Sequence, residues 1–370
     1  NSTTRADRNA NDQKLIIILN RKYLESSIAR ILRRLLRCSQ IYPFRERLMK
    51  IVIYGSQKRT GVLTEGQIID IASAVGKKGS ANAASLVDLN ALIMGGQATL
   101  DIVQTAVANL GEAGDDIIFS AEDTVLHAPR ANGARVACAG GNFAEHAISM
   151  AQRRVERGED NPIKGGPRDY VRDRGFWGFW KIDRESAGHN ANLPYPVRTS
   201  YLDYEGEVAV VLGKTGKNLK ETDIDDFVWG VTLLGDWSIR MSPEGGPMNF
   251  AMQKNFDNSC SIGPCIVVGD VDFMGIDLET SVNGEVRQKF RSGDMAFSYG
   301  EYLEFLSRDF TFYPGDIISG GTGAGTAADS SLTGENGKPL PDRFLKPGDV
   351  VDIVSPQIGT LRTNIIKNTG

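Results

Sequence analysis

One segment limits the possible folds of this chain more than any other, the sequence TSYLDYEGEVAVVLGK at residues 199–214. It alternates as a β-strand does, and the apolar run at residues 208–212 is typical of a buried strand. Side chains two residues apart in a strand lie on one face, so the alternation places Asp203, Glu205 and Glu207 together. The chain is therefore expected to contain a β-sheet with three carboxylates crowded on one side of a strand.

Crowded carboxylates need positive charge nearby, because they repel one another and raise each other's pKa. Lysine or arginine side chains could supply that charge, and so could a hard divalent cation, which prefers carboxylate oxygens. A solvated acidic face is the third alternative. A second apolar strand ends abruptly at Asp236. Glu205, Glu207 and Asp236 therefore form a plausible site for Mg²⁺, Mn²⁺ or Ca²⁺.

The composition is that of a globular protein. The chain has 370 residues, of which 41% are hydrophobic and 24% charged, and its net charge is −4. This balance argues against a disordered chain and against a nucleic-acid partner, and no apolar run is long enough to span a membrane. The four cysteines show no CxxC pattern, so a zinc site is not expected. Reduced cysteines predict a cytoplasmic location.

The charge is distributed unevenly along the chain. Residues 1–48 hold 11 lysines and arginines against 4 aspartates and glutamates, a balance of +7, whereas the rest of the chain carries −11. We interpret residues 1–48 as a basic N-terminal extension that is disordered or not native. An organelle-targeting segment and a partner-binding amphipathic helix at residues 20–37 are the alternatives.

The remaining residues predict an α+β fold that is rich in β-strands. Residues 49–128 have the pattern of a small N-terminal α/β domain, with strands followed by two helical segments. Residues 129–370 contain many short strands between Gly, Pro and Asp turns, including an Asn-Gly hairpin at residues 282–285. Such a run with few helices predicts a barrel-like or rolled-sheet body.

A series of motifs over residues 135–365 resembles, in the same order, the motifs of the fumarylacetoacetate hydrolase family. They are ACAGGNFAEHA, GFWKI, LDYEGEVAVVLGK, LLGDWSIR, KNFDNSCSIGPCIV, VNGEVRQ, YPGDIISGGTGAGT and LKPGDVVDIVSPQIGTLRTNII. The resemblance implies a mixed β-sandwich roll, a homodimer, and one divalent cation in each active site. It also implies that Glu205, Glu207 and Asp236 are the metal ligands, with Asp203 orienting a ligand or a metal-bound water.

The resemblance further implies an activity. Family members cleave carbon–carbon bonds in acylpyruvates and related β-diketo acids, and others decarboxylate, isomerise or dehydrate similar keto acids. We therefore predict a hydrolase that uses Mg²⁺ or Mn²⁺, with Ca²⁺ as a further candidate, to cleave a small keto acid. A decarboxylase, isomerase or dehydratase is the first alternative, and a catalytically weak metal-binding protein is the second.

Three residues are candidates for catalytic roles. Lys254 matches the lysine that the family has near the metal, and it is expected to stabilise negative charge or donate a proton. Arg240 is expected to bind a substrate carboxylate or oxyanion, unless it forms a salt bridge with a nearby carboxylate. His146 is suited to activate water as a base, although a histidine that packs against or caps a helix would look the same.

Substrate binding is assigned to Lys181, which is expected to line the pocket with Phe179 and Trp180. It is also assigned to Gly321 and Thr322, because the glycine-rich loop lets backbone amides and a hydroxyl approach a carboxylate. The chain also departs from the family. Ser149 stands where many members have a glutamate that pairs with the motif histidine, and Glu145 cannot replace it because adjacent helical residues do not face each other. The sequence therefore offers no clear carboxylate to orient His146.

Overall fold

The computed structural model describes residues 48–80, 82–111, 116–156, 158–244, 246, 248–334 and 339–369. The prediction for the basic segment, residues 1–48, therefore lies outside the described residues except at Leu48. Among the described residues, no helix combines the length and the apolar character needed to span a bilayer.

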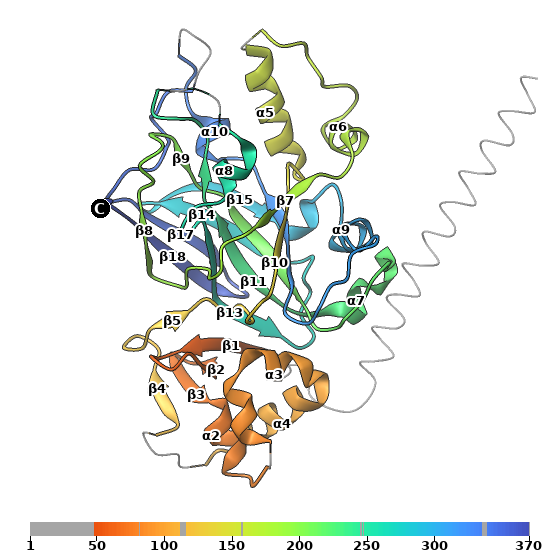
Figure 1. Cartoon of the computed structure of the whole chain (residues 1–370), viewed down its shortest axis with the longest axis vertical. Helices are drawn as coiled ribbons and strands as arrows, with labels where there is room; N and C mark the ends of the chain where they lie inside the picture. The colour runs from red at the N-terminus through yellow and green to blue at the C-terminus, as the bar shows by residue number, and fades with distance from the viewer. Residues whose placement is uncertain are drawn as a thin grey trace, which may run out of the picture. The chain divides into compact units, whose positions relative to one another are not determined.

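A mixed sheet is the centre of the described residues (Figure 1). Its strands are β1 (Met49–Tyr54), β2 (Arg59–Thr64), β3 (Gln67–Asp70), β4 (Ile118–Ser120), β5 (Leu126–His127), β6 (Val136–Ala139), β7 (Gly178–Lys181), β10 (Gly206–Leu212), β11 (Val228–Asp236), β13 (Cys260–Val268) and β16 (Ile317–Thr322). Their order is β4-β3-β2-β1-β13-β11-β10-β16-β6-β7, with β5 paired to β1. The apolar run at residues 208–212 is thus a fully buried central strand, as predicted.

A second, five-stranded sheet packs against the central strands. It consists of β8 (Ala191–Pro194), β14 (Asp277–Val282), β15 (Glu285–Arg291), β17 (Val350–Ser355) and β18 (Gly359–Ile366) in the order β15-β14-β17-β18-β8. Ile353 and Leu361 of this sheet share one core with Val208 and Val210 of β10. The predicted hairpin is confirmed at Asn283, whose positive φ fits the tight turn between β14 and β15.

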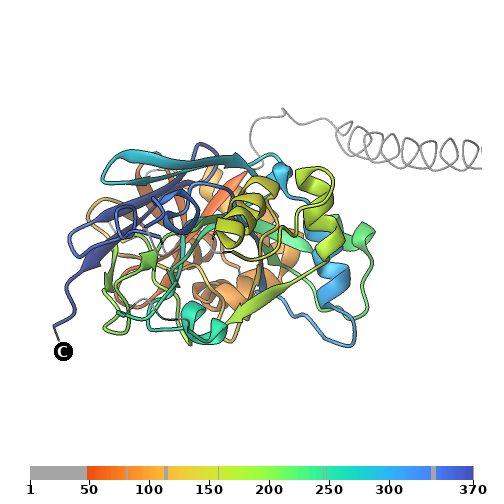
Figure 2. The same ribbon diagram turned by 90° about the horizontal axis from the view of Figure 1, so that it is seen from above.

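Helices cover the sheets and their ends. They are α2 (Ile71–Gly76), α3 (Leu89–Met94), α4 (Gly96–Ala108), α5 (Ala144–Glu156), α6 (Pro167–Arg174), α7 (Ile224–Phe227), α8 (Phe250–Lys254), α9 (Tyr299–Leu306) and α10 (Ala327–Ser330). Figure 2 shows α5 and α6 next to each other, and α5 also contacts α10. Helices α5, α6 and α10 each contribute residues to the wall of one cavity, among them His146, Arg174 and Ala328.

The predicted α+β, β-rich fold class is confirmed. The long sheet is open, with β4 and β7 as its edge strands, and the described strands form no closed barrel. Strand β1 of the segment predicted as an N-terminal domain pairs with β13, with Met49 opposite Val268. Both predicted domains therefore contribute strands to one sheet, and the predicted boundary near residue 128 stays a prediction.

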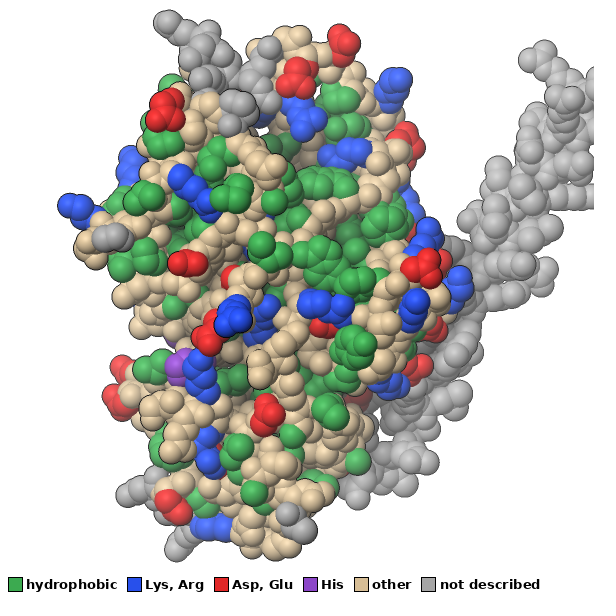
Figure 3. All heavy atoms as spheres, viewed as in Figure 1, with side chains coloured by type: hydrophobic (Ala, Val, Ile, Leu, Met, Phe, Trp, Pro, Cys, Tyr) green, Lys and Arg blue, Asp and Glu red, His purple; other side chains and the backbone are tan. Residues whose placement is uncertain are grey.

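The edge strand β7 lies beside exposed apolar side chains. Trp177, Phe250 and Phe305 are each more than one third exposed, and the rings of Trp177 and Phe250 are 5.5 Å apart. Figure 3 shows hydrophobic side chains gathered on this face over β7 and α9. A short edge strand with apolar neighbours is a surface on which another protein surface can pack.

Candidate active site

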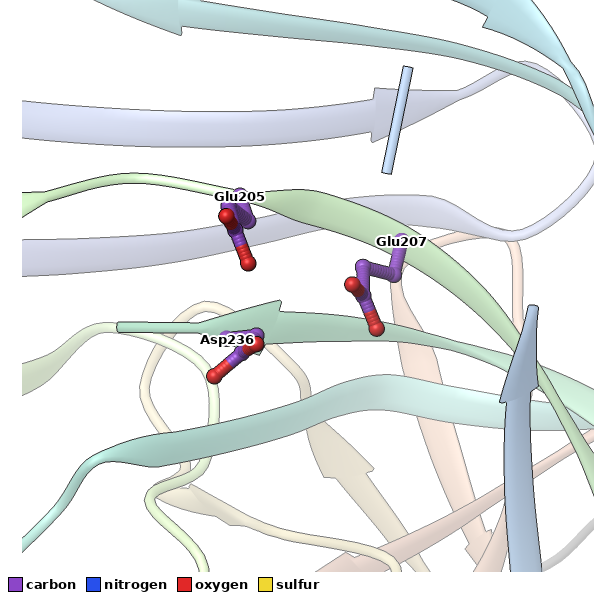
Figure 4. Close-up of side chains that lie close together, drawn as sticks. All are labelled: Glu205, Glu207 and Asp236. Carbon is purple, nitrogen blue, oxygen red and sulfur yellow. The ribbon is translucent and has the colours of Figure 1, made fainter. Parts of the chain in front are cut away.

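The register of two neighbouring strands brings three acidic side chains together. In the antiparallel pair β10 and β11, Gly206 lies opposite Gly235, and the backbone N–H of Asp236 donates to the carbonyl of Glu205 at 2.9 Å. Each of Glu205, Glu207 and Asp236 offers a carboxylate oxygen within 4.8 Å of the others, and all three are buried (Figure 4). The structure thus assembles the predicted ligand set.

Asp203 does not belong to this acidic cluster. It lies in β9 (Leu202–Asp203), which pairs with β12 (Ser238–Ile239) in a separate small sheet, because the chain leaves strand geometry at residues 204 and 205. Its carboxylate accepts the N–H groups of Ala327 and Ala328 at the start of α10, at 2.6 and 3.1 Å. Alternation alone therefore misplaced Asp203, which anchors α10 instead.

Two buried lysines lie among the carboxylates. The Nζ of Lys254 is 2.6 Å from an oxygen of Glu205 and 2.6 Å from an oxygen of Asp236, and it also donates to the hydroxyl of Ser238. Lys181 forms an ion pair with the other oxygen of Asp236 and donates to the carbonyl of Lys254 at 2.7 Å. Lys181 therefore lies beneath the site and holds Asp236 in place.

Arg240 links the acidic cluster to Asp203. Its Nε donates to Asp203 at 2.8 Å, and its Nη2 forms an ion pair with Glu205. Burial alone would raise the pKa of Glu205, but the charges of Arg240 and Lys254 hold that pKa well below its usual range. Glu205 is thus ionised and paired on both sides, and the salt bridge considered for Arg240 is present.

Glu207 is the carboxylate with the least compensation. No lysine or arginine of the described chain forms an ion pair with it, and its side chain accepts a hydrogen bond from the hydroxyl of Ser319. Burial, followed by the charges of Asp236 and Glu205, raises its pKa well above the usual range. Burial also raises the pKa of Asp236. A buried acidic group that lacks positive charge fits a hard divalent cation.

His146 has a carboxylate partner that sequence reasoning missed. Its Nδ1 lies 2.8 Å from Oδ2 of Asp329 in α10, and that carboxylate also accepts the backbone N–H of Gly325. Since an ionised carboxylate only accepts, Nδ1 carries a proton, and in the neutral imidazole Nε2 is then the acceptor nitrogen. A carboxylate that orients His146, absent at Ser149, is thus supplied by a residue 183 positions away.

A second missed residue is Gln288 of β15, which is almost fully buried. Its Oε1 accepts the N–H of Gly206 at 3.0 Å, and its Nε2 donates to the hydroxyl of Thr322 at 2.8 Å and to the carbonyl of Gly323 at 2.9 Å. The Thr322 hydroxyl in turn donates to the carbonyl of Gly206 at 2.9 Å. Both backbone groups of the residue between Glu205 and Glu207 are therefore fixed.

A cavity of about 460 Å³ opens onto these groups. Its wall includes six of the nine predicted site residues, namely His146, Glu205, Glu207, Arg240, Lys254 and Thr322, and Asp236 lies behind it. Lys181 and Gly321 do not line it. Gly321 has a φ of +87°, and a side chain there would approach the carbonyl of Ala139 at 2.8 Å, so this position in β16 requires glycine.

Comparison with known proteins gives a family match over most of the chain. The model of the fumarylacetoacetate hydrolase C-terminal domain matches residues 135–366. The oxaloacetate tautomerase YisK of Bacillus subtilis (strain 168) is 33% identical over 252 residues, which are 67% of this chain and 75% of the relative. An uncharacterized protein of Staphylococcus aureus (strain USA300) is 34% identical over 192 residues, which are 51% of this chain and 61% of that protein.

Solved structures share the fold. The fumarylacetoacetate hydrolase of Exiguobacterium antarcticum superposes with a TM-score of 0.61 at 25% identity, over 86% of this chain and 99% of that one. The maleylpyruvate hydrolase of Sphingobium sp. SYK-6, in complex with manganese(II) and pyruvate, gives a TM-score of 0.62 at 21% identity, over 87% and 100% of the two chains. At that identity the second similarity shows the fold alone.

Proposed function

The chain belongs to the fumarylacetoacetate hydrolase family, and we propose that it is a divalent-metal-dependent enzyme that cleaves a carbon–carbon bond in a small acylpyruvate or β-diketo acid. One observation carries the proposal: Glu205 and Glu207 of the buried acidic cluster line the same cavity as His146, whose Nδ1 is paired with Asp329. A metal site beside an oriented base is what keto-acid hydrolysis needs.

The three carboxylates would hold the cation, and Mg²⁺ or Mn²⁺ suits their oxygen donors. When bound, it would bind the carboxylate and keto oxygens of a 2-keto acid and stabilise negative charge on the keto oxygen. The Mn²⁺ and pyruvate in the Sphingobium enzyme support this assignment. Lys254 lines the cavity, and its ammonium group adds positive charge where negative charge develops on the substrate.

His146 would act as the base. Asp329 holds Nδ1–H, so Nε2 can take a proton from a water molecule that attacks the acyl carbonyl carbon. The bond from this carbon to C3 of the pyruvate part then breaks, and its electron pair passes to the pyruvate fragment. C3 takes a proton, and the products are a carboxylic acid and pyruvate.

Tautomerisation of oxaloacetate is the second candidate. The 33% identical relative is named an oxaloacetate tautomerase, and its match covers 67% of this chain. In that reaction one proton moves between C3 and the keto oxygen, and no water is consumed. Nε2 of His146 could carry this proton too, so the same pair of residues serves either reaction.

We also propose that the protein forms a homodimer and that it is located in the cytoplasm. A homodimer is supported by the exposed apolar side chains Trp177, Phe250 and Phe305 beside the edge strand β7. A cytoplasmic location is supported by Cys138, Cys260 and Cys265, which are free and buried in the described chain.

The test is a substrate screen of the full-length protein after metal removal, with Mg²⁺ or Mn²⁺ added back. Acetylpyruvate and fumarylpyruvate report hydrolysis through loss of the enol absorbance together with pyruvate formation, and enol-oxaloacetate reports tautomerisation without pyruvate. We expect metal-dependent turnover of an acylpyruvate. Turnover of oxaloacetate alone would favour the second candidate, and metal-independent or absent turnover of all three would contradict the proposed function.

A further inference from the structure

Five lysine and arginine side chains line the cavity, and they differ in whether a carboxylate neutralises them. Arg153, Arg240 and Lys254 each form an ion pair. Arg154, in the last turn of α5, and Arg174, in the last turn of α6, form none with the described residues. The cavity wall therefore carries two guanidinium groups whose charge is free to meet an anion.

Arg174 is held in position without using its charge. Its Nη2 donates to the carbonyl of Gly141 at 3.1 Å and more weakly to that of Gly140 at 3.4 Å. Its guanidinium carbon lies 5.4 Å from the ring centroid of Trp177. A side chain at Gly141 would clash with the same amino group. The turn between β6 and α5 thus holds the guanidinium group in place. The remaining N–H donors of Arg174 have no protein partner in the described structure.

The charges at the metal cluster show why a second anion would need Arg174. The three carboxylates of the cluster and Asp203, which Arg240 connects to it, make four acidic residues. Three basic residues pair with them, namely Lys181, Arg240 and Lys254. This leaves one negative charge in excess. A divalent cation would turn it into one positive charge, which the carboxylate of a 2-keto acid would neutralise. A further carboxylate would find no unbalanced positive charge at the cluster.

The cavity also has room for more than a three-carbon acid. Its volume is about 460 Å³, and its wall is largely apolar, with Met150, Trp177, Phe179, Met241, Met248 and Phe250. Contacts between the rings of Phe179, Phe250 and Trp177 connect Lys254 to Arg174. An apolar wall that ends at an unneutralised guanidinium group suits a substrate with a carbon chain and a distal carboxylate. A bidentate arginine–carboxylate pair would fix the end of that chain.

Building on the proposed function, we infer that Arg174 forms a subsite for a second carboxylate, so that the preferred substrates are 2-keto dicarboxylic acids. Arg154 adds attraction for the anion from the rim of the cavity. The keto-acid end is held at the metal cluster and the distal carboxylate at Arg174. Arg174 thus selects the substrate and takes no part in breaking its bonds.

Calorimetric titration of the Mn²⁺-loaded protein with two ligands of equal length tests the inference. 2-Oxoglutarate and 2-oxopentanoate share the 2-keto acid and five carbons and differ in the distal carboxylate, and 2-oxoadipate with 2-oxohexanoate repeats the comparison one carbon longer. We expect wild type to bind the better dicarboxylate about tenfold more tightly than its partner. Arg174→Gln should remove this preference and leave the affinity for the monocarboxylates unchanged.

Two further variants separate selection from stability. Arg174→Lys keeps the positive charge but loses the planar guanidinium group, which can donate two parallel hydrogen bonds. It should therefore retain part of the preference for dicarboxylates. Lys164→Gln removes a positive charge from the same exposed segment outside the cavity wall, and it should retain all of it. Equal affinity for both members of each pair in wild type, or the same loss for both in Arg174→Gln, would overturn the subsite while leaving the proposed function standing. Failure of all four ligands to bind with Mn²⁺ would overturn the proposed function and the subsite together.

Discussion

Glu207 and Glu205 are both proposed metal ligands, but their surroundings predict opposite effects on the metal-free protein. Glu207 has no cationic partner among the described residues, so Glu207→Gln removes a buried carboxyl group that no cation compensates. We expect metal affinity to fall at least 100-fold in calorimetric titration with Mn²⁺, with metal-free stability unchanged or raised by about 1 kcal/mol.

Glu205→Gln is the matched comparison. Glu205 pairs with Arg240 and Lys254, so neutralising it takes one of two carboxylate partners from each of these buried cations. Metal-free stability should fall by about 3–5 kcal/mol in denaturant unfolding. Glu279→Gln on the exposed part of β14 should change neither property. If Glu207→Gln binds Mn²⁺ as wild type does, the cation lies elsewhere.

His146 and Asp329 should affect turnover and leave metal binding intact. His146→Ala removes the proposed base and should lower kcat about 10²–10⁴-fold on the substrate found by the screen. Asp329→Asn keeps the shape but removes the carboxylate that fixes Nδ1–H, and we expect a loss of about 10–10³-fold. Unchanged Mn²⁺ affinity and melting temperature are the controls. Full activity of His146→Ala would exclude it as the base.

The sequence identified the three clustered carboxylates but not the whole candidate site. Glu205, Glu207 and Asp236 were predictable because they stand at the ends of strongly apolar strands. Asp329 was not, because it lies in a four-residue helix 183 positions from His146, and nothing local connects the two. Asp203 was assigned to the same strand as the two glutamates because alternation was extended across residues 204 and 205, where the chain is not a strand.

At the scale of elements, the hairpin of β14 and β15 in the second sheet contacts the strand that carries the acidic residues. Gln288 reaches from β15 to Gly206 and Thr322, so it holds the strand that carries both glutamates. Gln288→Leu keeps the size but removes three hydrogen bonds. We expect a loss of about 2–4 kcal/mol in stability, because buried polar groups lose their partners, and about tenfold weaker Mn²⁺ binding by titration.

The exposed neighbour Lys289, whose partner is Glu279, provides the control for this strand. Lys289→Gln should leave both properties unchanged, since an exposed ion pair contributes little. A Gln288→Leu protein that loses stability but binds Mn²⁺ normally would limit Gln288 to a structural role. The Asn-Gly turn made this hairpin predictable from sequence, whereas the contact of Gln288 with β10 depends on how the two sheets pack.

At the scale of the whole molecule, the order of the strands was the least predictable feature. Strand β1 lies beside β13, more than 200 residues away, and β16 pairs in parallel with β6. Local patterns give the strands and their buried faces, but they do not specify which distant strands become neighbours. The motif order predicted the family and its β-rich fold, because it uses information from all parts of the chain at once.

A proton and a metal ion should compete for Glu207, and this competition should change the stability of the whole protein with pH. Burial and the neighbouring charges of Asp236 and Glu205 raise the pKa of Glu207, so the folded metal-free protein holds that proton more tightly than the unfolded chain does. The stability that this proton contributes is fully present below the unfolded pKa of about 4.3 and is lost as pH rises through the raised folded pKa. A cation competes with the same proton, so its affinity should increase over that pH range.

Melting temperatures measured from pH 5 to 8, with a chelator or with excess Mn²⁺, test this linkage. The chelated protein should lose stability as pH rises, and the metal-bound protein should lose less, so the two curves separate toward high pH. At a free Mn²⁺ concentration of about 100 times Kd, the gain should approach about 2.7 kcal/mol. In Glu207→Gln the proton is absent and the cation binds poorly, so its curves should nearly coincide. Parallel wild-type curves with a constant separation would show that metal binding releases no proton from Glu207.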